Sequence, residues 1–169
     1  MNTKKPIALF TILLAIASYV PQIKAAEGYI GASKLHVIGD YWEFKNKENI
    51  IIITKDVVAT STNMKIECQK LVILHENISN SGDEKMAEKV KKLIATNDVK
   101  IQINNGHSTS SGKAEYDKED DKIILTEHPI AYLGEHEVTG CKITYYIENA
   151  SYEVESCPDQ KATGTITPK

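Results

Sequence analysis

The sequence predicts an all-β protein, and three observations carry that prediction. The first is alternation of apolar and polar residues, as in "MKIEC" from Met64 to Cys68 and "VKIQI" from Val99 to Ile103. A period of two is typical of strands that are buried on one face. The second is a series of polar turns, such as "STN", "NNGHS" and "GEHE", between these stretches. Many short strands at this spacing indicate a sandwich, a barrel or a rolled sheet.

The third observation is an internal repeat. The segments "TKDVVAT", "TNDVKI" and "TEHPIAY" each follow an apolar residue, and each leads to a second landmark: "KLVI", "KAEY" or "KITY". The separation between the two landmarks is nearly constant, at 14 or 15 positions. Such self-similarity predicts a stack of strand-turn-strand units. With 169 residues and 41% hydrophobic side chains, the chain suits one globular domain.

The N-terminal segment is set apart from this pattern. Lys4 and Lys5 form a basic region, an apolar stretch runs from Ile7 to Val20, and Ile23-Lys24-Ala25 resembles a cleavage site. These features predict a secretory signal peptide at residues 1–25 and a mature domain at 26–169. The alternative, an uncleaved anchor, is disfavoured because the apolar stretch falls short of the ~20 residues that a spanning helix usually needs.

One segment of the mature chain has helical signals. In "SNSGDEKMAEKVKKL", Ser81 can cap a helix, acidic residues come first and lysines last, and Met86, Val90 and Leu93 share a face. Because so short a helix is not stable alone, we expect a helical turn or a mobile insertion between strands at residues 81–93.

Charge and cysteine content limit the partners. Without residues 1–25 the chain carries 17 lysines against 23 carboxylates, and it contains no arginine, so nucleic acid is excluded as a predicted partner. Three cysteines remain, Cys68, Cys141 and Cys157, so at least one is unpaired within a monomer. Nothing in the sequence beyond their number supports a Cys141–Cys157 disulfide, and a buried strand cysteine is the preferred interpretation of Cys141 over a nucleophile.

No catalytic residue, metal site or cofactor is predicted, and the chain is not expected to be an enzyme. The acidic run "DKEDD" at 117–121 lacks the ligand spacing of a calcium loop, so it is interpreted as a solvated hairpin turn between the Tyr116 strand and "KIIL". In "GEHEVTG", His136 stands between two glutamates that cannot converge with it if the segment is a strand, and an exposed turn is favoured.

The repeats resemble a known family. Segments such as "ATNDV", "SGKAEYD" and "KIILTEH" are similar to the apolar-T-G-N-V, G-D-K-A-x-Y-D and K-V-x-L-T-G-N motifs of the LptA/OstA family, the periplasmic component of lipopolysaccharide transport. The resemblance extends from "LHVIGD" to "KATGTITPK". The family's Gly-Asn turn is replaced here by Lys55-Asp56, Asn97-Asp98 and Glu127-His128, which leaves the turn geometry open.

The resemblance implies a β-jellyroll-like fold, in which a double sheet is folded into a V-shaped slab around an apolar interior that holds acyl chains. It also implies head-to-tail self-association in the periplasm, bridging the inner-membrane and outer-membrane components of the transport system. The strands around "SKLHVIG" and "KATGTITPK" are the expected edges for such pairing. Lipopolysaccharide, held by its lipid A acyl chains, is the implied ligand.

Strand parity assigns the residues of the interior face. The predicted lipid-binding residues are Leu35, Val37, Val57, Ala59, Met64, Ile66, Leu71, Ile73, Val99, Ile101, Ile103, Tyr116, Leu125, Ile143 and Tyr145. Parity alone fits an ordinary closed sandwich core equally well, and the resemblance favours lipid. Two alternatives to a soluble carrier therefore stay open: a membrane-anchored or receptor-module relative, and a structural oligomerising β-protein without a lipid ligand.

Overall fold

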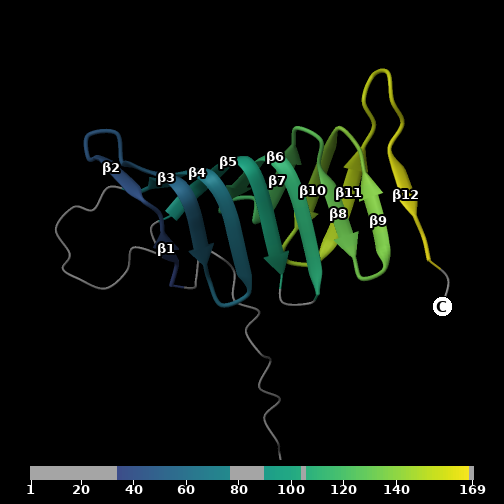
Figure 1. Ribbon diagram of the computed structural model, residues 1–169, viewed down its shortest axis with the longest axis horizontal. Coiled ribbons are helices and arrows are strands. Elements are labelled where there is room, and N and C mark those ends of the chain that lie inside the picture. The colour runs from purple at the N-terminus through teal and green to yellow at the C-terminus, as the bar shows by residue number, and fades with distance from the viewer. Residues whose placement is uncertain (1–33, 77–89, 104–105, 168–169) are drawn as a thin grey trace, which may run out of the picture.

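The computed structural model describes residues 34–76, 90–103 and 106–167, which form twelve antiparallel strands (Figure 1). No helix occurs among these residues, and so none that could cross a membrane. The predicted signal peptide lies outside them. The strands are β1 (His36–Ile38), β2 (Tyr41–Lys45), β3 (Ile50–Thr60), β4 (Met64–His75), β5 (Val90–Ile103), β6 (His107–Asp117), β7 (Lys122–Thr126), β8 (Ile130–Leu133), β9 (His136–Thr139), β10 (Lys142–Tyr146), β11 (Ser151–Glu155) and β12 (Thr163–Thr165).

Each of the four long strands β3 to β6 runs through two layers. One half of the strand pairs within the first layer and the other half within the second. The register breaks after Thr54 in β3, after Glu67 in β4 and after Thr96 in β5. On one side of these breaks the order is β2-β3-β4-β5-β6-β7-β10-β11, which we call the first layer. On the other side it is β1-β3-β4-β5-β6-β8-β9-β12, the second layer.

The line of breaks forms a corner with left-handed backbone. Lys55 and Asp56 have φ of 68° and 45°, and the Asn97-Asp98 and Glu127-His128 pairs also have positive φ. All three pairs therefore adopt a left-handed backbone without glycine, although this conformation is unfavourable for non-glycine residues. Asp and Asn tolerate it best, and they occupy three of these six positions.

The repeat also has a physical explanation at this corner. Thr54, Thr96 and Thr126 lie just beside it in the first layer, and they pair across strands with Lys70 and Lys113. The recurring threonine and lysine landmarks of the sequence are thus neighbours in one row across the sheet. Stacked strand-turn-strand units, as predicted, build the fold.

Gly112 shows how tightly the corner is packed in β6. Its N–H donates to the carbonyl oxygen of Glu127 at 2.8 Å, which ties β6 to the segment between β7 and β8. A Cβ atom at this position would lie 2.6 Å from the Cβ of Glu127, closer than real Cβ contacts. Only glycine allows the two backbones to approach in this way.

The helical prediction for residues 81–93 is wrong where the structure tests it. Residues 90–93 begin β5, and residues 77–89 lie outside the described part. Leu93 is buried and pairs with Ile73 and Tyr116, while Lys92 points to the outer face and forms an ion pair with Glu115. Pairing with a strand on each side satisfies the backbone and overrides the local helical preference.

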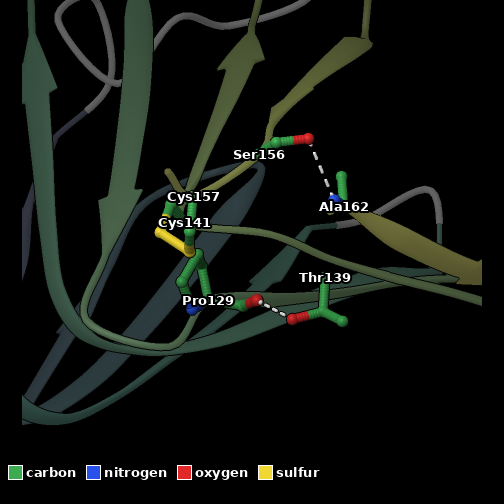
Figure 2. The surroundings of a disulfide bond; sticks show 6 residues. All are labelled: Pro129, Thr139, Cys141, Ser156, Cys157 and Ala162. Carbon is green, nitrogen blue, oxygen red and sulfur yellow. Dashed lines mark hydrogen bonds between the residues drawn. A yellow bond between two sulfur atoms is a disulfide. The ribbon is translucent and has the colours of Figure 1, made fainter. Parts of the chain in front are cut away.

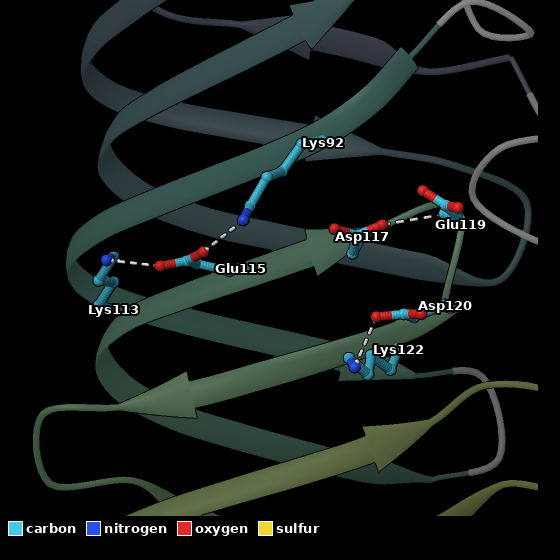
Figure 3. Close-up of polar contacts among 7 residues, drawn as sticks. All are labelled: Lys92, Lys113, Glu115, Asp117, Glu119, Asp120 and Lys122. Carbon is cyan, nitrogen blue, oxygen red and sulfur yellow. Dashed lines mark hydrogen bonds and ion pairs between the residues drawn. The ribbon is translucent and has the colours of Figure 1, made fainter.

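The acidic run "DKEDD" forms the hairpin turn between β6 and β7, as predicted. The backbone N–H of Glu119 donates to Oδ1 of Asp117 at 3.0 Å, and Lys122 forms an ion pair with Asp120 at 2.6 Å (Figure 3). These contacts are local and solvent-facing. On the neighbouring outer face, Glu115 lies between Lys113 and Lys92 (Figure 3). Hydrogen bonds from the two lysines lower the pKa of its carboxyl, and the bond from Lys113 has the larger effect.

Candidate functional site

The inner face of the first layer consists of two rows of side chains that run across all eight strands. The Trp42 row lies nearer the corner and consists of Trp42, Ile53, Leu71, Ala95, Ala114, Leu125, Ile143 and Val154. The Phe44 row lies farther from it and consists of Phe44, Ile51, Ile73, Leu93, Tyr116, Ile123, Tyr145 and Tyr152. Both rows are continuous from the first edge of the layer to the last.

The second layer faces them with a matching row. The Val37 row consists of Val37, Ala59, Ile66, Ile101, Thr109, Ala131, Val138 and Gly164. Contact between the layers is direct, since the ring of His107 in β6 lies 5.8 Å from that of Tyr152 in β11. The apolar members of the three rows share one interior with their neighbours.

Every residue that parity assigned to the interior faces it. All are buried except Leu35, Val37 and Ile103, which are partly buried and pack against the core. Several interior residues were missed. Ile51 and Ile53 lie in the unbroken run "IIII", which hides parity, and Leu93 ends the segment where helical signals misled the assignment. Ala95 lies just beyond that segment. Trp42 and Phe44 alternate with Glu43 and could have been found by the same rule.

The interior is open at its N-terminal end. Trp42 and Phe44 point to the inner side of β2, yet 37% of Trp42 and 59% of Phe44 remain exposed. Their rings stack with centroids 5.9 Å apart, and the indole N–H of Trp42 donates to the carbonyl oxygen of Gly39. Inward-facing aromatic rings that are this exposed mark the point where the apolar interior meets solvent.

The C-terminal end of the interior is more polar. The rings of Tyr145 and Tyr152 lie 4.6 Å apart, and burial, with a smaller contribution from Tyr145, raises the pKa of Tyr152 far above its usual value. In the second layer, Thr109 and Ser111 are buried polar residues. Ser111 Oγ donates to the carbonyl oxygen of Lys113 at 3.0 Å. The hydroxyl groups here lie among apolar walls.

A disulfide joins Cys141 and Cys157 at this end, which corrects the prediction of a buried strand cysteine at position 141 (Figure 2). Cys141 is exposed in the link between β9 and β10, and Cys157 lies in the link between β11 and β12. The corner brings the two links together, and no local sequence signal encodes that proximity. The bond fixes the last link next to the corner. Two hydrogen bonds stand beside it, from Thr139 to Pro129 and from Ala162 to Ser156.

The other candidates for chemistry have structural explanations. Cys68 is buried, and burial raises the pKa of its thiol to about 11, so it stays neutral and unreactive. His136 begins strand β9, where an exposed turn was expected, and its Nδ1 accepts a hydrogen bond from the backbone N–H of Thr167. Within the described ranges, no three His, Cys, Asp or Glu side chains come together as a metal site.

A hollow of about 440 Å³ lies on the side of the slab opposite the corner. Its inward lining includes Met64, Ile103 and His107, at the ends of the hairpins β3–β4 and β5–β6. The corner joins the two layers along one long side, and these hairpin ends lie along the other. The hollow therefore lies at the rim of the interior along this second long side.

Comparison with known proteins gives one family. Residues 36–151 match the family model described as LptA/(LptD N-terminal domain) LPS transport protein. A search of curated proteins gave no match. Among solved structures, the chain is similar to LptH from Pseudomonas aeruginosa, described as the LptA-homologous periplasmic component of the conserved lipopolysaccharide transport device, with a TM-score of 0.70 at 12% identity over 83% of this chain and 99% of that one. At that identity the likeness shows the fold.

Proposed function

The chain belongs to the family of lipopolysaccharide transport proteins that comprises LptA and the LptD N-terminal domain, and from this premise we propose that it holds lipopolysaccharide acyl chains between its two layers. The observation that carries the proposal is the continuity of the Trp42, Phe44 and Val37 rows from edge to edge. None of the side chains in these rows is charged. The apolar path reaches solvent at Trp42 and Phe44.

The energetics favour acyl chains over headgroups in this interior. Moving an alkyl chain out of water is worth ~0.8 kcal/mol per methylene group, and it requires no basic surface. The centre of the interior is closely packed, with Ile53, Leu71 and Ile143 fully buried. Lipid therefore enters by parting the two layers along the side opposite the corner, where none of the described strands connects them. Phosphate-bearing headgroups stay in solvent.

Location and partners follow from the same premise. LptH is described as a periplasmic component of its transport device, and residues 1–25 have the pattern of a cleaved export signal. We place this chain in the periplasm, between inner-membrane and outer-membrane components of the transport system. The membrane-anchored or receptor-module alternative requires that the N-terminal segment be retained or that further domains be attached.

Strand edges that pair with no other described strand support bridging by head-to-tail assembly. β1 and β2 form one end of the slab and β11 and β12 the other, at opposite ends of Figure 1. Each end presents backbone N–H and C=O groups that can pair with another chain. Joining the last edge of one copy to the first edge of the next is a heterologous contact, which builds open filaments.

Site-specific photo-crosslinking tests the proposal. A photoreactive side chain at Ile101, which is 2% exposed in the Val37 row, should capture lipopolysaccharide in cells. The same group at Gln102, on the outer face of the same strand, is the matched control and should capture none. Equal capture at both positions would reject the inner face as the lipid site, and no capture at Ile101 would favour the remaining alternative: a structural oligomerising β-protein with a closed core.

A further inference from the structure

Two hydroxyl groups inside the C-terminal half of the interior have no hydrogen-bond partner among the described residues: Thr109 Oγ1 and Tyr152 OH. Thr109 is 4% exposed and lies in the Val37 row, while Tyr152 lies in the Phe44 row of the opposite layer. His107 connects them, because its ring packs on Tyr152 and its side chain lies two residues from Thr109 on the same face of β6.

The fold is able to satisfy inward hydroxyls, which makes these two exceptional. Ser111, two residues along β6, donates to the backbone of Lys113. A buried hydroxyl without a partner is unfavourable, and each one in a folded protein calls for a physical explanation. In its row Thr109 lies between Ile101 and the small residue Ala131, and the row ends at Gly164. The ring of Tyr152, in the opposite layer, packs on His107, two residues before Thr109.

We propose that this polar cluster, defined as His107, Thr109 and Tyr152, is a subsite for a neutral hydrogen-bonding group of the bound amphiphile, such as a hydroxyl or an amide on its acyl chain. The inference rests on the proposed function and refines it. The half of the interior from β1 to β5 takes bare alkyl chain, and the cluster takes the polar substituent. No lysine or carboxylate lies in the three rows, so an anionic group is not the expected occupant.

The position of the cluster indicates where on the acyl chain the substituent should be. His107 also lines the hollow on the side opposite the corner, so the cluster lies near the route by which lipid enters. A substituent close to the headgroup end of the chain reaches it while the headgroup stays in solvent. Tetradecanoic acid and 3-hydroxytetradecanoic acid are therefore suitable matched probes.

The test compares the affinities of the full mature chain for the two probes. The wild type should bind the hydroxylated probe about fivefold more tightly, the effect of one net hydrogen bond to a group that is otherwise unpaired. Tyr152→Phe and Thr109→Val, which delete one hydroxyl each with little change of shape, should bring the ratio towards one. Tyr146→Phe is the matched control, because its hydroxyl is exposed and donates to Glu153 on the outer face, and it should keep the wild-type ratio.

A second measurement separates a ligand subsite from a structural role. Removing an unpaired buried hydroxyl should leave the melting temperature of the free protein unchanged or raise it, whereas a structural hydroxyl would lower it. Equal binding of both probes by the wild type, or a preference that survives both substitutions, would overturn the subsite alone. Failure of the wild type to bind either probe would overturn the proposed acyl-chain binding, and the subsite with it.

Discussion

The two halves of the interior are lined by different side chains. From β1 to β5, the inner rows consist mainly of branched aliphatic residues such as Ile53, Ile66 and Ile73. From β6 to β12, the first layer contributes Tyr116, Tyr145 and Tyr152, while the second layer contributes small and hydroxyl-bearing residues such as Thr109 and Ala131. The large rings of the first layer thus lie in the half of the slab where the second layer carries several smaller side chains.

The two halves also end differently. The first ends in exposed inward-facing rings on β2, whereas the second ends at a disulfide that fixes the link to β12. Under the proposed function, the apolar, open end is the one that receives lipid tails or the edge of another molecule. A covalently fixed end presents β12 in a constant position, although that strand has only three residues, all exposed. The difference gives the slab a direction, which a head-to-tail bridge requires.

The largest expected loss of stability comes from a charge introduced into the aliphatic half. Ile66→Asp should lower the free energy of unfolding by about 3–5 kcal/mol, because it buries an unpaired charge between apolar walls. Thr109→Asp, in the same row but in the polar half, should lower it by at least ~1 kcal/mol less, since the Tyr152 hydroxyl can donate to the new carboxylate. Urea denaturation measures both, with Gln102→Asp on the outer face as a control within about 0.5 kcal/mol of wild type. Equal losses at Ile66 and Thr109 would remove the distinction between the halves.

The next effect concerns the C-terminal end alone. Replacing Cys141 and Cys157 together by serine should lower the free energy of unfolding by roughly 3 kcal/mol, the chain-entropy value for a loop of about this length. Hydrogen exchange should accelerate in β11 and β12 and stay unchanged in β3 and β4, because the bond touches only the last links. Cys68→Ala is the matched control for loss of a thiol without loss of the bond. Uniform acceleration across the sheet would show that the bond stabilises the whole fold rather than this end.

These differences between regions explain what the sequence could and could not reveal. Where apolar and polar residues alternate strictly, as in residues 64–68 and 99–103, parity identified the interior correctly. It failed at Ile51 and Ile53, since four consecutive isoleucines carry no period, and at Leu93, where lysines and acids imitate a helix. The corner and the disulfide depend on contacts between segments far apart in the chain. Single residues do not encode such contacts, although the repeat marked the positions of the corner.

Deleting residues 161–169 tests whether the C-terminal edge is the one that joins. This deletion removes β12 and leaves β9 as the edge of the second layer. We expect self-association, measured by sedimentation, to weaken about tenfold or more, while circular dichroism still reports a folded monomer. Substituting Asp159 by Asn, in the link before the deleted segment, is a control that should leave association unchanged. Association that persists after the deletion, or a wild type that stays monomeric at high concentration, would rule out the bridge.

The smallest expected effect is a pH dependence at the turn between β6 and β7, beside the tyrosine-rich half. Burial, with a smaller contribution from Glu148, raises the pKa of Asp121, and a hydrogen bond from Tyr116 opposes the shift. Since the raised pKa belongs to the folded state, the protonated carboxyl stabilises the fold at low pH, and this stabilisation is lost as the pH rises through the folded pKa.

Asp121→Asn keeps an acceptor for Tyr116, removes the charge and suits the positive φ of 46°. At pH 7 the variant should therefore be more stable than wild type, by at most about 1 kcal/mol in urea denaturation. The advantage should shrink at pH 3, where wild-type Asp121 is mostly protonated. Asp120→Asn, one residue earlier and exposed in its ion pair with Lys122, should show no such gain. An advantage for Asp121→Asn that is the same at both pH values would mean that the backbone preference of asparagine, and not the buried charge, accounts for it.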